Sequence, residues 1–140
     1  MCGIFGASFQ NKPISHDLFS ESLELIHHRG PDSTGKFFDD ASFIAFGHKR
    51  LSIIDLTDHG SQPMSSIDKK YQIIFNGEIY NFSEIRTKLK SFGYKFFSSS
   101  DTEVLLNAYI EWGAEAVKKF RGMFSFAIYD KSKKIIFLAR

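Results

Sequence analysis

Short apolar runs at the spacing of β-hairpins constrain the fold of this chain more than any other sequence feature. The 140 residues include 16 Phe, and most of them lie in alternating runs such as Phe124-Ser125-Phe126. Alternation with a period of two turns one face of a strand toward a core, and aromatic residues in this pattern are typical of sheet interiors. The helical segments come in a few blocks and do not alternate with the strands. The pattern therefore predicts an α+β fold with antiparallel sheet.

Apolar periodicity and turn residues predict where the individual elements lie. The expected strands are residues 3–9, 35–38, 43–46, 71–75 and 94–97, followed by a hairpin with arms at 123–129 and 135–138. The first expected helix is capped by Ser15, ends near residues 29–31 and has an apolar face of Leu18, Phe19, Leu23 and Ile26. The second begins at Asn81 or Ser83 and ends at Gly93, and the third spans residues 101–112.

The chain is expected to form one domain over residues 1–140, because it contains no internal repeat, low-complexity tract or linker. The last predicted strand runs to Arg140 without a turn or tail. We therefore expect a domain that is incomplete at its C-terminus.

Composition narrows the classes of partner. A net charge of +2, with scattered lysines, gives no basic stripe for nucleic acid or an anionic membrane. No apolar run approaches the length of a membrane span, and the N-terminus does not resemble a signal peptide. The single cysteine excludes an internal disulfide and fits a reducing compartment, so a cytoplasmic location is expected.

Two other site classes are also disfavoured. Residues 30–36 nearly match a phosphate-binding loop, but Phe37 stands where Ser or Thr would bind Mg²⁺ and no helix is expected to follow. The five histidines show no metal-ligand spacing, and the adjacent His27 and His28 diverge on a helix. No metal site is therefore expected.

The position of Cys2, directly after the initiator Met1, makes it a candidate nucleophile. A lone cysteine is more often a small buried hydrophobe than a nucleophile. Removal of the initiator Met1, which a small second residue generally permits, would give Cys2 both a thiol and a free α-amine. An α-amine has a pKa of about 8 and is a usable base at neutral pH, so one residue would supply nucleophile and base. With Met1 retained, the amine is acylated and this chemistry fails.

Asn76-Gly77 has two interpretations. The pair is a strong hairpin-turn signal, and from these residues alone a turn is favoured. The alternative is an oxyanion hole, in which the Asn76 amide and the backbone N–H of Gly77 converge on one oxygen.

Arg50 and Asp101 are candidates for binding a free amino acid. A guanidinium can hold the α-carboxylate in bidentate fashion, and a carboxylate can hold the α-ammonium group. Taken alone, Arg50 also fits a charge at a strand edge and Asp101 a helix N-cap.

The motifs gain specificity from their order along the chain. In sequence they are Met1-Cys2-Gly3-Ile4-Phe5-Gly6, His28-Arg29-Gly30-Pro31-Asp32, Gly47-His48-Lys49-Arg50-Leu51-Ser52-Ile53, Gln62-Pro63, Phe75-Asn76-Gly77-Glu78-Ile79-Tyr80-Asn81, Ser100-Asp101-Thr102-Glu103 and Gly122-Met123-Phe124-Ser125-Phe126-Ala127. Over nearly its whole length the chain resembles the glutaminase domain of class II glutamine amidotransferases. Within that group it is most similar to glutamine-hydrolysing asparagine synthetases.

The resemblance implies the four-layer αββα sandwich of N-terminal-nucleophile hydrolases and an activity that hydrolyses L-glutamine to glutamate and ammonia. It implies that Cys2 is the nucleophile, that Asn76 and Gly77 form the oxyanion hole, and that an enzyme–glutamyl thioester forms.

The resemblance also assigns residues around the substrate. It implies that Arg50 holds the α-carboxylate and that Asp101 and Glu78 hold the α-ammonium end. Leu51 and Ile53 would line the pocket, partly through backbone groups, and Arg29 would support the catalytic terminus without touching substrate.

The acceptor half of such a reaction lies outside this chain. Asparagine synthetases continue with a domain that uses ATP and aspartate, so ATP and Mg²⁺ are expected only there and no cofactor is expected here. A homodimer of the full-length protein is left open. Two alternatives are also left open, namely an ammonia donor for an acceptor other than aspartate and a non-catalytic fragment that keeps the fold.

Overall fold

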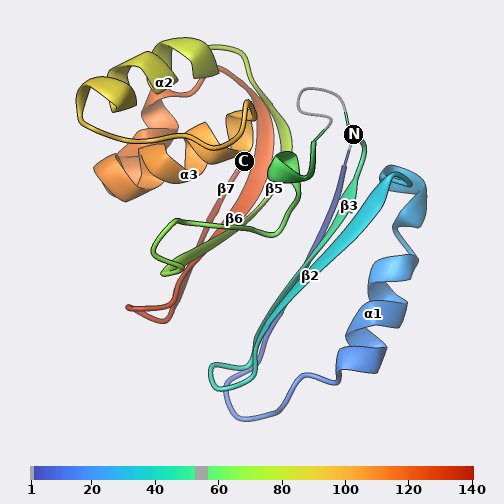
Figure 1. Cartoon of the computed structure of the whole chain (residues 1–140). Helices are drawn as coiled ribbons and strands as arrows, with labels where there is room; N and C mark the ends of the chain where they lie inside the picture. The colour runs from blue at the N-terminus through green and yellow to red at the C-terminus, as the bar shows by residue number, and fades with distance from the viewer. Residues whose placement is uncertain (1, 53–56) are drawn as a thin grey trace.

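Two antiparallel β-sheets lie face to face, and helices cover the outer face of each (Figure 1). The computed structural model describes residues 2–52 and 57–140. The first sheet has the strand order β1 (Gly3–Ser8), β3 (Ile44–Arg50), β2 (Ser33–Asp39), and α1 (His16–Glu24) packs on it. The second has the order β4 (Met64–Ser65), β5 (Tyr71–Ile79), β6 (Gly122–Asp130), β7 (Ile135–Ala139), and is covered by α2 (Phe82–Ser91) and α3 (Asp101–Trp112). The predicted αββα sandwich is confirmed.

Three apolar layers follow from the alternation along the strands. Ile73 and Phe75 of β5 pack against the α2 and α3 side, whereas Ile74 faces the first sheet. On β3, Ile44 and Phe46 face the second sheet, and Ala45 lies in the cluster around α1. Because the side-chain period of a strand is two, even-numbered residues of β3 and β5 point into the layer between the sheets.

The central strand β3 is the most enclosed element of the first sheet. All seven of its residues are buried, and it pairs with β1 from Gly3↔Lys49 to Ser8↔Ile44. On the α1 side, buried Lys49 contacts Glu24 and donates to the Thr34 hydroxyl at 2.8 Å. These contacts join β3 to α1 and β2 at the residue that pairs with Gly3 of β1.

The helix boundaries follow local capping chemistry. The Ser15 side chain accepts a hydrogen bond from the Leu18 N–H at the start of α1, and Ser100 accepts one from the Glu103 N–H at the start of α3. The third helix ends at Gly113, whose φ of 58° favours glycine.

Three local predictions are wrong. β5 continues through Asn76-Gly77, so the favoured hairpin turn does not form. Residues 94–97 are not a strand, because the Glu103 carboxylate takes up the Phe97 and Ser98 N–H groups. Leu18 is 64% exposed, and the buried residues of α1 are Phe19 and Leu23 alone.

Candidate active site

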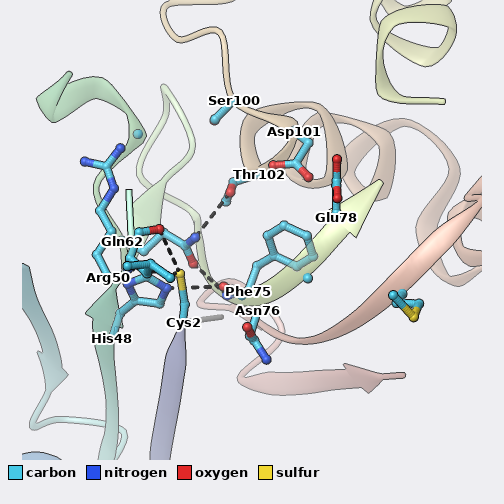
Figure 2. Close-up of a pocket in the computed structure, with 14 residues that line it drawn as sticks. Cys2, His48, Arg50, Gln62, Phe75, Asn76, Glu78, Ser100, Asp101 and Thr102 are labelled. Carbon is cyan, nitrogen blue, oxygen red and sulfur yellow. Dashed lines mark hydrogen bonds between the residues drawn. The ribbon is translucent and has the colours of Figure 1, made fainter. Parts of the chain in front are cut away.

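A cavity of about 250 Å³ opens at one end of the layer between the sheets (Figure 2). Its size lies near the lower end of ligand pockets, which suits a small substrate. The residues around it are Cys2, His48, Arg50, Leu51, Gly60, Gln62, Phe75, Asn76, Gly77, Glu78, Ser100, Asp101, Thr102 and Met123. The structure therefore brings seven predicted site residues together at one cavity, namely Cys2, Arg50, Leu51, Asn76, Gly77, Glu78 and Asp101.

Cys2 reaches this cavity because it precedes β1 at an even-numbered position, in phase with Ile4, which packs between the sheets. Its thiol is half-buried. The Sγ atom accepts a hydrogen bond from the Leu51 N–H at 3.4 Å and lies 3.6 Å from the Leu51 carbonyl oxygen. The backbone of Leu51 thus fixes the thiol at the end of β3.

The edge of β5 supplies backbone donors to the same cavity. The backbone N–H and C=O groups of the odd-numbered residues of β5 point away from β6. At one end of the strand those of Tyr71 bond to Ser66, and at the other end the Ile79 N–H donates to Asp101 Oδ2 at 3.0 Å. Gly77 follows the same alternation, and the structure shows no acceptor for its N–H in residues 2–52 or 57–140. This N–H faces the cavity beyond the short strand β4.

Gly77 can occupy this position only without a side chain. Its φ of 151° lies in a region that other residues rarely adopt. A Cβ here would overlap the Met123 carbonyl oxygen and lie 2.6 Å from the Phe124 Cα. The glycine therefore lets β5 stay paired with β6 while its N–H remains open to a ligand.

Asn76 points into the layer between the sheets, in phase with Ile74. Figure 2 shows Cys2 in the view between His48 and Asn76. Asn76 Oδ1 is buried and has no hydrogen-bond partner among the described residues. A buried polar atom without a partner is costly, so the side-chain amide is set up to bond a ligand.

Asp101 and Glu78 give the opposite end of the cavity a negative charge (Figure 2). Asp101 is 4% exposed, and Ser100 rather than Asp101 caps α3. Burial raises the pKa of Asp101, with a smaller contribution from Glu78, although the Ile79 N–H and other backbone donors oppose the change. A cationic ligand group beside the carboxylate would lower this pKa again.

Arg50 lines the cavity but its guanidinium also supports the wall. Its Nη1 donates to the Thr57 carbonyl oxygen at 2.9 Å, and in Figure 2 the side chain extends away from Asp101. Arg50 and Asp101 therefore stand at separate parts of the cavity wall. Ile53 lies outside the described residues, so the structure does not place that predicted pocket residue.

Arg29 lies outside the cavity, with an exposed side chain in the short helix η1 (His27–Arg29). A Cβ built on Gly3 would lie 3.1 Å from the Arg29 Cβ. The helix therefore packs directly against β1, next to Cys2, and the supporting role of Arg29 stays a prediction.

Seven cavity residues had no role assigned from the sequence, and three of them, His48, Gln62 and Thr102, make side-chain hydrogen bonds that connect parts of the cavity. One signal was available for His48, because it continues the inward-facing series of Ile44 and Phe46 with a polar side chain. The contacts of Gln62 and Thr102 depend on the packing of a loop against α3 and have no sequence signal of that kind.

Comparisons with known proteins agree with this geometry. The Bacillus subtilis glutamine phosphoribosylpyrophosphate amidotransferase, solved with ADP and GMP, matches with a TM-score of 0.73 over 91% of this chain and 35% of that chain. At 20% identity this match establishes the fold, that of the N-terminal-nucleophile hydrolases. A family profile described as the glutamine amidotransferase domain matches residues 1–140, and this chain belongs to that family.

Two sequence relatives place the chain more closely. Asparagine synthetase [glutamine-hydrolyzing] 1 of Bacillus subtilis is 46% identical across the whole chain, which spans 22% of that protein. Amidase chry2 of Gibberella zeae is 36% identical over 85% of the chain and 18% of its own length. The chain thus spans less than a quarter of either relative. The predicted resemblance to glutamine amidotransferases, and to asparagine synthetases among them, is confirmed.

Within residues 2–52 and 57–140, no helix has the length and apolar character needed to cross a membrane. The same residues contain no group of three His, Cys, Asp or Glu side chains that could hold a metal ion.

Proposed function

We propose that this chain hydrolyses L-glutamine to glutamate and ammonia, with Cys2 as the nucleophile once Met1 is removed. The observation that carries the proposal is the meeting of Cys2 with the open Gly77 N–H and the buried Asp101 carboxylate at one small cavity. A nucleophile, an oxyanion donor and a site for an ammonium group are the three parts that this reaction needs.

The first chemical step forms a thioester. The Cys2 sulfur attacks the side-chain carbonyl carbon of glutamine, and the α-amine of Cys2 takes the thiol proton. The carbonyl π electrons move onto oxygen, which accepts hydrogen bonds from the Gly77 N–H and from Asn76 Nδ2. An amide rotates by half a turn to exchange its oxygen and nitrogen, so the buried end of Asn76 can serve as this donor. Collapse of the oxyanion breaks the C–N bond, and ammonia leaves with the proton held by the α-amine.

The second step hydrolyses the thioester. The α-amine takes a proton from water, the hydroxide oxygen attacks the thioester carbonyl, and the same donors hold the new oxyanion. The C–S bond breaks, the sulfur recovers a proton, and glutamate leaves. No other reactant is needed.

The negative end of the cavity would orient the substrate. The Asp101 carboxylate would bind the α-ammonium group of glutamine, with Glu78 adding to the local negative charge. Arg50 would hold the α-carboxylate, together with the backbone around Leu51 and Ile53. Because the Arg50 guanidinium contacts the Thr57 carbonyl, substrate binding would require it to share this contact or turn toward the cavity.

The ammonia is proposed to serve asparagine synthesis from aspartate and ATP in the full-length protein. The name of the Bacillus subtilis relative supports this acceptor, and the share of that protein outside the match leaves room for a synthetase domain. ATP and Mg²⁺ would bind there. A homodimer and a cytoplasmic location stay predictions.

A second candidate is ammonia release for an acceptor other than aspartate. It is favoured by the match to a protein named Amidase chry2. The full-length sequence that carries this chain separates the two candidates, because the acceptor is chosen outside these residues.

The test uses the intact protein, with removal of Met1 checked by mass spectrometry. Glutamine is supplied and both glutamate and ammonia are measured. We expect equal amounts of the two products from the wild type and none above background from Cys2→Ala. Equal activity in Cys2→Ala, or in protein that keeps Met1, would exclude the mechanism.

A further inference from the structure

Two buried side chains hold the backbone of Phe75 from opposite parts of the molecule. Gln62 Oε1 accepts a hydrogen bond from the Phe75 N–H at 2.6 Å, and His48 Nε2 lies 3.2 Å from the Phe75 carbonyl oxygen (Figure 2). Phase along β5 puts both groups on the edge that carries the Gly77 N–H two residues later. The two side chains therefore take the place of a neighbouring strand where β4 has ended.

Each of these side chains also belongs to another part of the cavity. His48 lies on β3, opposite Ile4 of β1, and so on the sheet that carries Cys2. Gln62 Nε2 donates to the Thr102 hydroxyl at 3.2 Å, next to Asp101 at the start of α3. Phe75 and its two partners thus connect the nucleophile, the oxyanion donors and the ammonium site.

The contact with Phe75 determines the tautomer of His48. A carbonyl oxygen only accepts, so Nε2 must carry the hydrogen and the neutral ring keeps its lone pair on Nδ1. His48 is 1% exposed, and Nδ1 has no partner among the described residues. Burial, with a smaller contribution from nearby Arg50, lowers the pKa of His48 to about 4 against the opposing effect of the Phe75 carbonyl. The ring is therefore a neutral donor at physiological pH and a poor base.

We propose that His48 and Gln62 are positioning residues that fix the open edge of β5, and with it the Gly77 N–H, at the distance from Cys2 that the reaction requires. The inference rests on the proposed glutaminase function and adds two residues to which that function gave no role. Its physical basis is that small misplacements of catalytic groups are costly, with about 1 Å worth ~100-fold in rate.

The experiment measures kcat and KM for ammonia release in the intact protein with Met1 removed. His48→Leu and Gln62→Met remove the two contacts with Phe75 while keeping apolar bulk. We expect kcat to fall by ~10- to 100-fold in each, with a smaller change in KM, because the lost interaction acts on transition-state donors. His48→Gln keeps a donor at the position of Nε2, and we expect it to retain most of the wild-type kcat with an unchanged pH profile.

Controls separate positioning from loss of fold. Ile85→Val removes a methyl group from the core under α2, away from the cavity, and we expect a lower thermal midpoint with unchanged kcat. If His48→Leu or Gln62→Met does not fold, Thr102→Val tests the inference instead, because it removes the hydroxyl that accepts a hydrogen bond from Gln62. We expect Thr102→Val to lower kcat more than it raises KM.

Each outcome bears on a named claim. Wild-type kcat in folded His48→Leu and Gln62→Met, or in Thr102→Val where these do not fold, overturns the inference and leaves the proposed function standing. If His48→Gln loses as much kcat as His48→Leu, and the pH profile of His48→Gln lacks a basic group seen in the wild type, His48 acts as a general base. That result also overturns the inference. A wild type that releases no ammonia overturns the proposed function and this inference with it.

Discussion

The two halves of β5 are built differently. At residues 71–73 the strand has neighbours on both sides, β4 and β6, and its backbone groups are used within the sheet. From Phe75 to Ile79 it keeps β6 but has lost β4, and its outer edge is bonded by side chains of β3, of α3 and of the loop before β4. Sheet edges are usually covered or blocked. Among residues 2–52 and 57–140, no group covers this edge at Gly77, and the proposed oxyanion donor lies there.

The largest effect on the open edge of β5 is expected from Gly77→Ala. The added Cβ would overlap the Met123 carbonyl oxygen, and the φ of 151° would be strained. Displacement of one oxyanion donor is expected to lower kcat by ~100- to 1,000-fold, measured as ammonia release. Gly93→Ala is the matched control, since Gly93 also has a positive φ of 94° but open space around it. It is expected to lower stability and leave kcat unchanged; equal losses in both variants would contradict the role of Gly77.

Acid titration tests the buried state of His48. Its pKa falls from 6.5 in the unfolded chain to about 4 in the folded one, so the unfolded chain binds a proton first as the pH falls. Stability is therefore present above pH 6.5 and is lost between pH 6.5 and about 4, by about 3 kcal/mol at 1.36 kcal/mol per pH unit.

Denaturant titrations of wild type and His48→Gln measure this loss directly. The variant is expected to lack this part of the acid dependence, because glutamine does not titrate. An identical dependence in both proteins would show that His48 is not the buried neutral group described here.

Asp101→Asn tests the far end of the cavity. The amide can still accept from the Ile79 N–H, but it cannot pair with an ammonium group. Loss of one charged hydrogen bond is expected to raise KM by ~10- to 100-fold with a smaller effect on kcat.

The pH dependence of kcat/KM gives a second reading of Asp101. Because burial raises its pKa above the ordinary 3.8, kcat/KM is expected to fall as the pH drops through that raised value. Asp101→Asn should lose this acid limb, and a limb that persists in the variant would assign it to another group.

The smallest effect on activity is expected from a substitution in β3 at the end of the strand that lies away from the cavity. Ile44 is 4% exposed and packs between the sheets. Ile44→Val is expected to cost about 1 kcal/mol of stability and to leave kcat and KM unchanged. A change in kcat there would mean that the first sheet is less rigid than its complete pairing implies.

The sequence predicted the parts of the fold that local periodicity determines. The helix over residues 101–112 and the final hairpin were correct because their apolar spacing and glycine stops act within a few residues. Residues 94–97 are rich in aromatic side chains, as strands are, yet Glu103 and the Arg86 guanidinium bond to the backbone of residues 97–100 and hold it as a loop. Such contacts join distant positions and leave no local signal.

The site also has parts that the sequence predicted and parts that it did not. Cys2, Asp101 and the Asn76-Gly77 pair were predicted from residue types that suit the proposed reaction, and all four residues line the cavity. Their roles stay predictions. Asn76-Gly77 locally favours a turn, and pairing with β6 on one side of the strand overrides that preference. The contacts of His48 and Gln62 with Phe75 exist only because β4 ends early, a consequence of tertiary packing.

The most direct test of this account is the covalent state of Cys2 during turnover. The intact protein, with Met1 removed, is mixed with glutamine and quenched in acid, and its N-terminal peptide is analysed by mass spectrometry. We predict a glutamyl group in thioester linkage to Cys2, absent from Cys2→Ala. Turnover without any adduct on Cys2, or with the adduct on another residue, would contradict the assignment of Cys2 as the nucleophile.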